Sequence, residues 1–326
     1  MKPSINPVRL NAVKINGGFW GPRLETVRTR TIPHLHHFLK EIGYLDAWNL
    51  NWKEGQPKKP HIFWDSDVAK WMEAAAYSLT WHPDAELEAL LDTIIERMAR
   101  AQAPDGYLNT YYLTVEPGKR WMNERAMHET YCAGHLIEAA VAYYETTGKR
   151  RFLEIMQRYA DHIASVFGPG EGQIHGYPGH EEIELALVKL YRASGEARYL
   201  DLARFFIDER GKQPHYFDVE ARARGEDPAP FHAQFLDTLY GDYSYFQAHV
   251  SVSQQSEAVG HAVRATYLYS GMADVAALDG DDTLPCSLHR VAGCLPAHLA
   301  EPDRAAYVRD RRDRRRGEHR GLLHRL

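Results

Sequence analysis

Apolar residues recur at three- and four-residue spacing along most of the first 280 residues, which predicts an all-α protein. The predicted helices span residues 24–42, 65–79, 86–103, 127–146, 149–166, 181–193 and 197–209. Ahead of them, Val8, Leu10, Val13 and Ile15 alternate loosely and predict a short strand-like N-terminal arm, residues 1–18.

A weak repeat organises these helices. Residues 144–153 and 191–200 both read as Tyr, small polar residues, Gly, a charged stretch, an aromatic residue and Leu. Each copy predicts a helix, a short turn and a second helix, and stacked hairpins of this kind form solenoids or closed toroids. Irregular spacing and long loops at residues 104–126 and 211–258 favour a closed α/α toroid, or part of one, over an open solenoid.

Composition and charge limit the possible functions. The 326 residues are 44% hydrophobic and 25% charged, as in a globular protein, with a net charge of −5. Nine Arg against four acids make residues 303–326 basic, so the rest of the chain carries −10. An acidic body does not suit nucleic acid. No apolar run approaches a membrane span or a signal segment, which predicts a cytoplasmic protein without a membrane partner.

Three histidines form the main candidate site. His128, His180 and His261 each stand at or near the start of a predicted helix. Because the inner helices of a toroid start at one rim, these side chains are expected to converge on a shared funnel. Neutral imidazoles beside Trp, Tyr and Gln suit sugar hydroxyls, which need both donors and acceptors. Any one of them could instead cap a helix, but three at equivalent places favour a site.

Other chemistry is less well supported by the pattern. Asp65 and Asp67 are either an acid/base pair or helix-capping acids, and capping is favoured. Glu182 and Glu184 are expected on opposite helix faces, so that at most one points inward. No His-x3-His or Cys-x2-Cys spacing occurs, so no metal ligands are predicted. Phosphate-binding loops and Gly-x-Ser-x-Gly elbows are also absent.

Several long segments resemble glycoside hydrolase family 127, the β-L-arabinofuranosidase family. They include GGFWGPRLETVRTRTIPHLHHFL, FWDSDVAKWMEAAAYSL, ARAQAPDGYLNTYY, MHETYCAGHLIEAAVAYYETTGKRRFLEI and FGPGEGQIHGYPGHEEIELALVKLYRASGEARYLDLARFFIDERG. The resemblance runs from about residue 10 to residue 284. It implies that residues 19–284 form part of a catalytic (α/α)6 toroid, which is expected to be incomplete, with about six to eight helices.

The resemblance implies hydrolysis of non-reducing-end β-L-arabinofuranosides with retention of configuration. In the family a Glu is the general acid/base and a zinc-bound Cys is the nucleophile, with further Cys ligands and a second Glu at the zinc. The sugar is held by histidines that align with His128, His180 and His261. Segments containing Asp65, Asp67 and Gln255 also match the surroundings of the family's pocket, so these residues are further candidates for substrate binding.

The resemblance stops after Leu284. The family's catalytic Glu, nucleophile and zinc ligands match nothing in residues 285–326, and Cys132, Cys286 and Cys294 are not assigned to zinc. The chain is therefore expected to be truncated, to lack zinc and to be inactive. Back-translated and shifted by one base, residues 307–326 can read as the family's TYVTGGIG segment and the EAF that holds its catalytic Glu. We expect a lost reading frame, and the alternative is a genuine basic tail that binds a partner or an anionic surface. The DNA sequence beyond codon 284 would distinguish the two.

Two other function classes remain open on the sequence. One is a different (α/α)6 carbohydrate-active enzyme, of the unsaturated glucuronyl hydrolase type, using Asp65 or Asp67. The other is a non-catalytic helical repeat that binds sugar. The oligomeric state is not predicted.

Overall fold

The computed structural model describes residues 8–15, 17–228, 243–279, 283–285, 287–288 and 290–291. Most of the predicted tail, residues 285–326, and the first seven residues of the arm lie outside the described residues. The described part is built from helices, as the sequence predicted, and it contains no strand. The longer helices are α2 (Ile32–Ile42), α3 (Trp64–Trp81), α4 (Ala85–Ala101), α7 (Glu129–Thr147), α8 (Arg151–Val166), α9 (Ile183–Ser194), α10 (Ala197–Glu209) and α13 (Ala262–Asp279).

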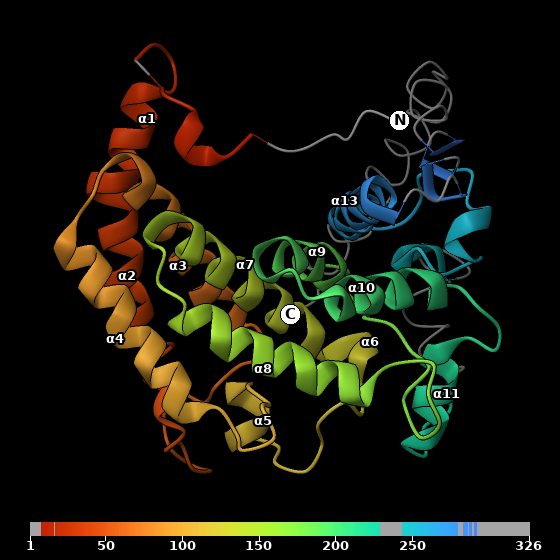
Figure 1. Ribbon diagram of the computed structural model, residues 1–326. Helices are drawn as coiled ribbons and strands as arrows, with labels where there is room; N and C mark the ends of the chain where they lie inside the picture. The colour runs from red at the N-terminus through yellow and green to blue at the C-terminus, as the bar shows by residue number, and fades with distance from the viewer. Residues whose placement is uncertain are drawn as a thin grey trace, which may run out of the picture.

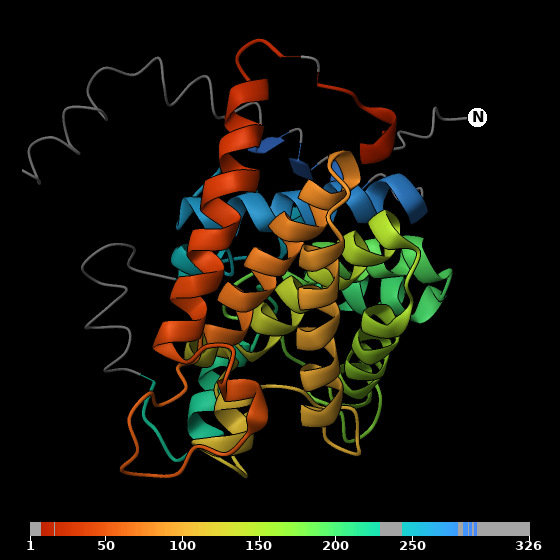
Figure 2. The ribbon, with the colours of Figure 1, turned by 90° about the vertical axis from the view of Figure 1, so that its left-hand side faces the viewer.

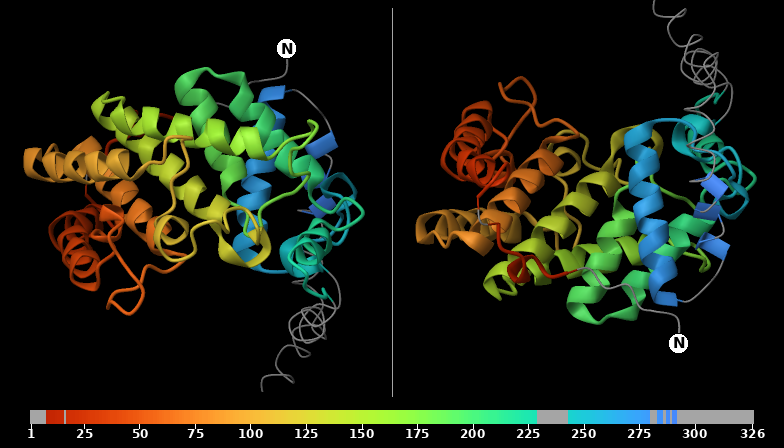
Figure 3. Two further views of the ribbon diagram at one scale, coloured as in Figure 1. Left: turned by 90° about the horizontal axis from the view of Figure 1, so that it is seen from below. Right: turned by 90° about the horizontal axis from the view of Figure 1, so that it is seen from above.

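These helices form two layers. Helices α3, α7, α9 and α13 contact one another in that order and make the inner layer (Figure 1). Helices α4, α8 and α10 each follow an inner helix and contact their neighbours in the outer layer. Seen from below and from above, the paired helices lie side by side across the molecule, from α3 on one side to α13 on the other (Figure 3). This is the arrangement expected of an (α/α) toroid.

The layers follow from the distribution of apolar residues on each helix. Outer helix α8 buries Phe152, Met156, Tyr159 and Ile163, which recur at three- and four-residue spacing and face the inner layer. Inner helix α7 is different, since every residue from Glu129 to Tyr143 is buried. A helix that contacts α3, α8 and α9 has no free face, which explains why its apolar pattern shows little periodicity.

The repeated sequence corresponds to the turns between paired helices. Gly148 ends α7 with a φ of 74°, and Gly195 ends α9 with a φ of 79°. This left-handed conformation closes a helix and favours glycine, and in both places the next helix begins within three residues. The predicted helix–turn–helix units are therefore confirmed.

Some elements differ from the prediction. The arm is not strand-like throughout, because Leu10–Ala12 form a short 3-10 turn and, among the residues that the structure describes, no strand pairs with the extended residues around it. It contacts α3 and runs across the top of the molecule to the start of α1 (Gly21–Thr26), which continues into α2 through a π turn (Figure 2). In their described parts, the predicted loops hold the short helices α5 (Thr110–Thr114), α6 (Glu124–Met127) and α11 (Tyr216–Ala223). None of the described helices has the length and apolar character to cross a membrane.

Candidate functional site

The starts of the inner helices meet at one rim, and the three predicted histidines meet there too. The ring centroids of His128 and His180 lie 5.8 Å apart, and those of His180 and His261 lie 6.2 Å apart. All three side chains are partly exposed. The predicted convergence of these residues, called the histidine rim below, is therefore confirmed.

Aromatic side chains complete the rim. Tyr131, one turn into α7, packs its ring 4.5 Å from His180 and 5.6 Å from His128. Phe63, directly before α3, lies 4.6 Å from His128, and Tyr267 of α13 lies 5.8 Å from His180. The sequence prediction omitted these rings. Their positions at or near the starts of the inner helices were the sequence signal that could have placed them beside the histidines.

The hydrogen bonds of the histidines define what they offer a ligand. His128 Nδ1 lies 2.8 Å from the carbonyl oxygen of Ala126, and His180 Nδ1 lies 2.7 Å from that of Glu181. Because a carbonyl only accepts, each neutral ring keeps its proton on Nδ1 and presents Nε2 as an acceptor. His261 Nδ1 instead receives a long 3.5 Å contact from the backbone N–H of Arg264, which leaves its Nε2–H as a donor.

All three histidines are held in the neutral form. Burial lowers the pKa of His128 to about 4 and that of His180 to about 2, and the Arg264 guanidinium lowers both further. Burial and Arg264 also lower the pKa of His261. The rim therefore combines two neutral acceptors and one neutral donor at physiological pH.

Buried arginines hold the segment that carries His180. Arg264 donates to the Gly179 carbonyl, and Arg210 donates to the Pro178 carbonyl at 2.9 Å. Arg210 also pairs with Glu181 at 2.9 Å and Glu184 at 3.2 Å, with all three side chains buried. Fixed carbonyls and a paired guanidinium leave His180 little freedom to move.

This network corrects one prediction about the glutamates. Glu182 precedes α9 with an extended φ of 176°, so it does not follow the helical spacing. As a result both Glu182 and Glu184 are buried, at 0% and 1% exposure, rather than one inward and one outward.

The two aspartates have different environments. Neither caps α3, whose N-cap is Phe63, and both lie in the first turn, where the helix dipole favours acids. Buried Asp65 accepts hydrogen bonds from Thr110 N at 2.7 Å and Thr110 Oγ1 at 2.6 Å, and burial raises its pKa to about 6. Asp65 therefore ties the loop before α5 to α3. Asp67 is 42% exposed beside Lys70, and its contact with a sugar stays a prediction.

Gln255 is part of the scaffold of its loop. Its side chain is 1% exposed, and its amide donates to the carbonyls of Gln247 at 2.6 Å and Val250 at 3.2 Å. Gln247 in turn donates to Val259 O at 2.8 Å, just before His261. The structure thus places Gln255 behind the rim rather than on its surface.

A cavity of about 390 Å³ lies at the opposite ends of the inner helices. Its lining includes Tyr77 and Thr80 of α3, Thr146 of α7, Ala193 of α9 and Arg9 of the arm. These are the C-terminal ends of the inner helices, whereas the histidine rim gathers the N-terminal ends. The cavity and the rim are therefore separate features.

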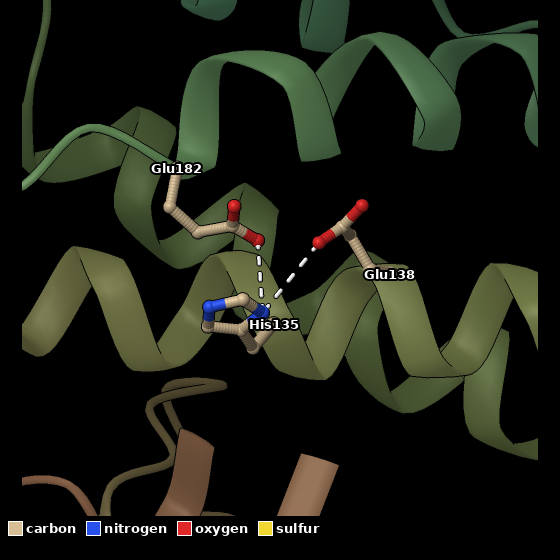
Figure 4. Close-up of side chains that lie close together, drawn as sticks. All are labelled: His135, Glu138 and Glu182. Carbon is tan, nitrogen blue, oxygen red and sulfur yellow. Dashed lines mark ion pairs between the residues drawn. The ribbon is translucent and has the colours of Figure 1, made fainter. Parts of the chain in front are cut away.

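The described residues do not fit a Cys-based zinc site. Cys132 is fully buried, its Sγ donates to Ile62 O at 3.1 Å, and burial raises the pKa of its thiol well above the usual range. A neutral thiol is neither a nucleophile nor a zinc ligand. Cys286 and Cys294 lie outside the described residues. A different donor set does occur, formed by His135, Glu138 and Glu182 (Figure 4). The sequence pattern does not reveal this set, because two of its members are three residues apart and the third is on another segment.

Comparisons with known proteins agree with this architecture. Residues 12–292 match the family described as β-L-arabinofuranosidase, GH127 catalytic domain. The non-reducing end β-L-arabinofuranosidase of Bifidobacterium longum subsp. longum is 46% identical over 228 residues, which are 68% of this chain and 34% of that protein.

Two solved structures are similar as well. A GH127 β-L-arabinofuranosidase from Geobacillus stearothermophilus T6 is 50% identical with a TM-score of 0.80, over 85% of this chain and 44% of that one. The GH127 β-arabinofuranosidase BT3674 is 38% identical with a TM-score of 0.76, over 88% and 43%. The chain thus spans less than half the length of these relatives.

Proposed function

Because the chain belongs to the GH127 β-L-arabinofuranosidase family, we propose that its histidine rim binds the terminal sugar of a β-L-arabinofuranoside. Family membership removes the unsaturated glucuronyl hydrolase alternative, and it places the protein among glycosidases. The buried, Thr110-bound state of Asp65 is a further argument against an Asp65 acid/base.

One observation supports the proposal above all others. Three neutral imidazoles come from three separate helix starts, and the His180 ring lies 5.8 Å from that of His128 and 6.2 Å from that of His261. Their Nε2 atoms take no part in the protein hydrogen bonds described above. Two acceptors and one donor match sugar hydroxyls, which both donate and accept. The rings of Tyr131 and Phe63 supply apolar surface for the carbon face of the sugar.

We propose in addition that the 326-residue chain assayed alone binds the sugar without hydrolysing it. Retaining hydrolysis needs a nucleophile on one side of the sugar and a general acid on the other. Cys132 is a buried neutral thiol, so it supplies no nucleophile. In this proposal the family's catalytic Glu and zinc-bound Cys have no counterpart in the chain, and the rim positions the sugar for groups supplied elsewhere in an intact enzyme.

Binding is tested with methyl β-L-arabinofuranoside, using saturation-transfer NMR and calorimetry on the full chain. His128→Ala, His180→Ala and His261→Ala should each weaken binding at least about tenfold, since each removes a hydrogen bond to the ligand. His37→Ala is the matched control, because His37 is an exposed histidine on α2. Binding that all three rim variants retain would refute the proposed site.

Turnover is tested separately with an aryl β-L-arabinofuranoside, with and without added zinc. No release of arabinose is expected from the chain alone. Zinc-dependent release would overturn the proposal that the catalytic groups are missing, while leaving the proposed sugar site intact.

A further inference from the structure

A buried polar cluster lies one helical turn along α7 from Tyr131 of the rim. His135 and Glu138 come from α7, and Glu182 comes from the segment before α9. Their side chains are 3%, 8% and 0% exposed. His135 Nδ1 lies 3.3 Å from Glu182 Oε1 and 3.5 Å from Glu138 Oε2, so the three side chains point toward a common centre (Figure 4).

Several atoms of this cluster lack hydrogen-bond partners within the described residues. Neither ring nitrogen of His135 and neither carboxyl oxygen of Glu182 makes a hydrogen bond of regular geometry, although Glu138 interacts with both side chains. The 3.3 and 3.5 Å approaches do not have hydrogen-bond geometry. Buried polar groups are nearly always paired, because an unpaired one costs about 1–3 kcal/mol or more. The cluster therefore lacks a partner that could bind the imidazole nitrogen and the carboxylate oxygens at the same time.

The charges around the cluster are also unbalanced. The carboxyl groups of Glu73, Glu138 and Glu182 interact electrostatically with one another, and Lys189, which pairs with Glu138, is the cation they share. Lys70 is also close, but it lies 3.9 Å from Asp67 on the same helix face. Two negative charges would remain if all of these groups were ionised, which favours a divalent cation.

We propose that His135, Glu138 and Glu182 bind one divalent transition-metal ion of the zinc class. Tetrahedral zinc with bonds of about 2.0–2.1 Å holds its ligand atoms about 3.3 Å apart, close to the two spacings found here. One imidazole and two carboxylates form a donor set that zinc and cobalt accept. This site contains no thiolate, so it is distinct from the zinc that the family resemblance implies.

The backbone supports the close approach that the site needs. A Cβ on Gly134 would lie 2.6 Å from Glu182 Cγ and 3.0 Å from Ile183 N. Glycine at this position therefore lets the start of α9 approach α7 next to His135. A bound ion would link α7 to the start of α9 beneath the histidine rim. The inference does not rest on the proposed sugar specificity.

A shared proton is the competing arrangement. Burial and the neighbouring Glu138 raise the pKa of Glu182 well above its usual range, so a neutral Glu182 could face an ionised Glu138 without any metal. That arrangement predicts no specific metal uptake, which makes the two accounts distinguishable.

The experiment uses the full 326-residue chain, stripped with a chelator and titrated with Co²⁺ and then Zn²⁺. The expected result is one Co²⁺ per chain, with tetrahedral d–d absorption and no thiolate charge-transfer band, followed by displacement by Zn²⁺. Glu182→Gln should weaken Co²⁺ binding by about 100-fold or more, because losing a ligand exceeds the 10–100-fold cost of outer-shell changes.

Two variants control for charge and for the rim. Glu73→Gln removes a nearby carboxylate that is not a ligand and should weaken Co²⁺ binding by no more than about tenfold, the low end of the cost of outer-shell changes. His180→Ala should leave uptake unchanged if the rim is not the site. Failure of the wild-type chain to take up one ion would overturn the proposal, as would uptake unaffected by Glu182→Gln or abolished by His180→Ala. If Glu182→Gln does not fold, the wild-type stoichiometry and cobalt spectrum decide.

Discussion

Replacing Gly179 by alanine should displace the segment that carries His180. A Cβ at this position would lie 2.7 Å from the carbonyl carbon of Arg125 and closer still to the carbonyl oxygens of Glu124 and Arg125. These are backbone atoms at α6, so no flexible side chain can move away. Gly179 N also donates to Glu124 O at 3.1 Å, and that bond would break as the segments separate.

The expected cost follows from this geometry. Restoring ordinary contact requires a shift of roughly 1 Å, and overpacking of this kind costs about 1–3 kcal/mol, with the lost hydrogen bond adding about 1 kcal/mol. The melting temperature should fall by roughly 5 °C or more. Sugar binding should weaken more than stability alone explains, because the shift moves His180 away from His128 and His261.

Differential scanning fluorimetry and calorimetry of sugar binding measure the two effects. Gly21→Ala is the matched control, since a Cβ there meets nothing within 4 Å and Gly21 lies in α1, away from the rim. It should change stability by less than about 1 kcal/mol. If Gly179→Ala melts within 1 °C of the parent chain and binds sugar equally well, the close approach of α6 to the His180 segment is wrong.

Three further predictions concern buried polar groups. Arg210→Met should destabilise the fold by about 3–5 kcal/mol in urea unfolding, because two buried glutamates lose their cation; full stability would contradict this. Burial lowers the pKa of His180 from its unfolded value of 6.5 to about 2 in the folded chain. The contribution of His180 to the free energy of unfolding is therefore fully present above pH 6.5 and is lost as the pH falls toward 2. His180→Gln should therefore lose less stability than the parent between pH 7 and pH 5, and an equal loss would exclude this assignment. Thr110→Val should cost about 1–3 kcal/mol in the same assay by removing a hydrogen bond to buried Asp65, whereas an unchanged midpoint would show that the bond is dispensable.

The spacing of apolar residues was sufficient to predict the long helices, but it did not predict the short helices in the segments between them. The apolar spacing of α8 reports its single buried face directly. The short helix α5 is capped by Asn109, whose side chain accepts from Tyr112 N, and α6 is capped by Asn123, whose side chain accepts from Ala126 N. Asn at a helix start is a signal that the sequence contains. A helix of one turn, however, has too few apolar positions to show the helical spacing of three and four residues.

The candidate site divides in a similar way. The starts of inner helices are fixed by topology, so the convergence of His128, His180 and His261 could be predicted without coordinates. The scaffold roles of Asp65 and Gln255 could not, because each is defined by a partner on another segment. A pair of acids before a helix has the same sequence signal whether it caps, reacts or holds a loop.

The sequence by itself determined the all-α class, the helix pairs with their glycine turns, the family and the shared rim of histidines. Each depends on spacing along one chain segment or on the order of segments. Only the tertiary structure decided which imidazole nitrogens face outward, which acids are buried, and that His135, Glu138 and Glu182 share a centre. Those properties depend on neighbours brought from α7 and α9 into one dry interior, where the loss of water sets both the pKa values and the need for partners.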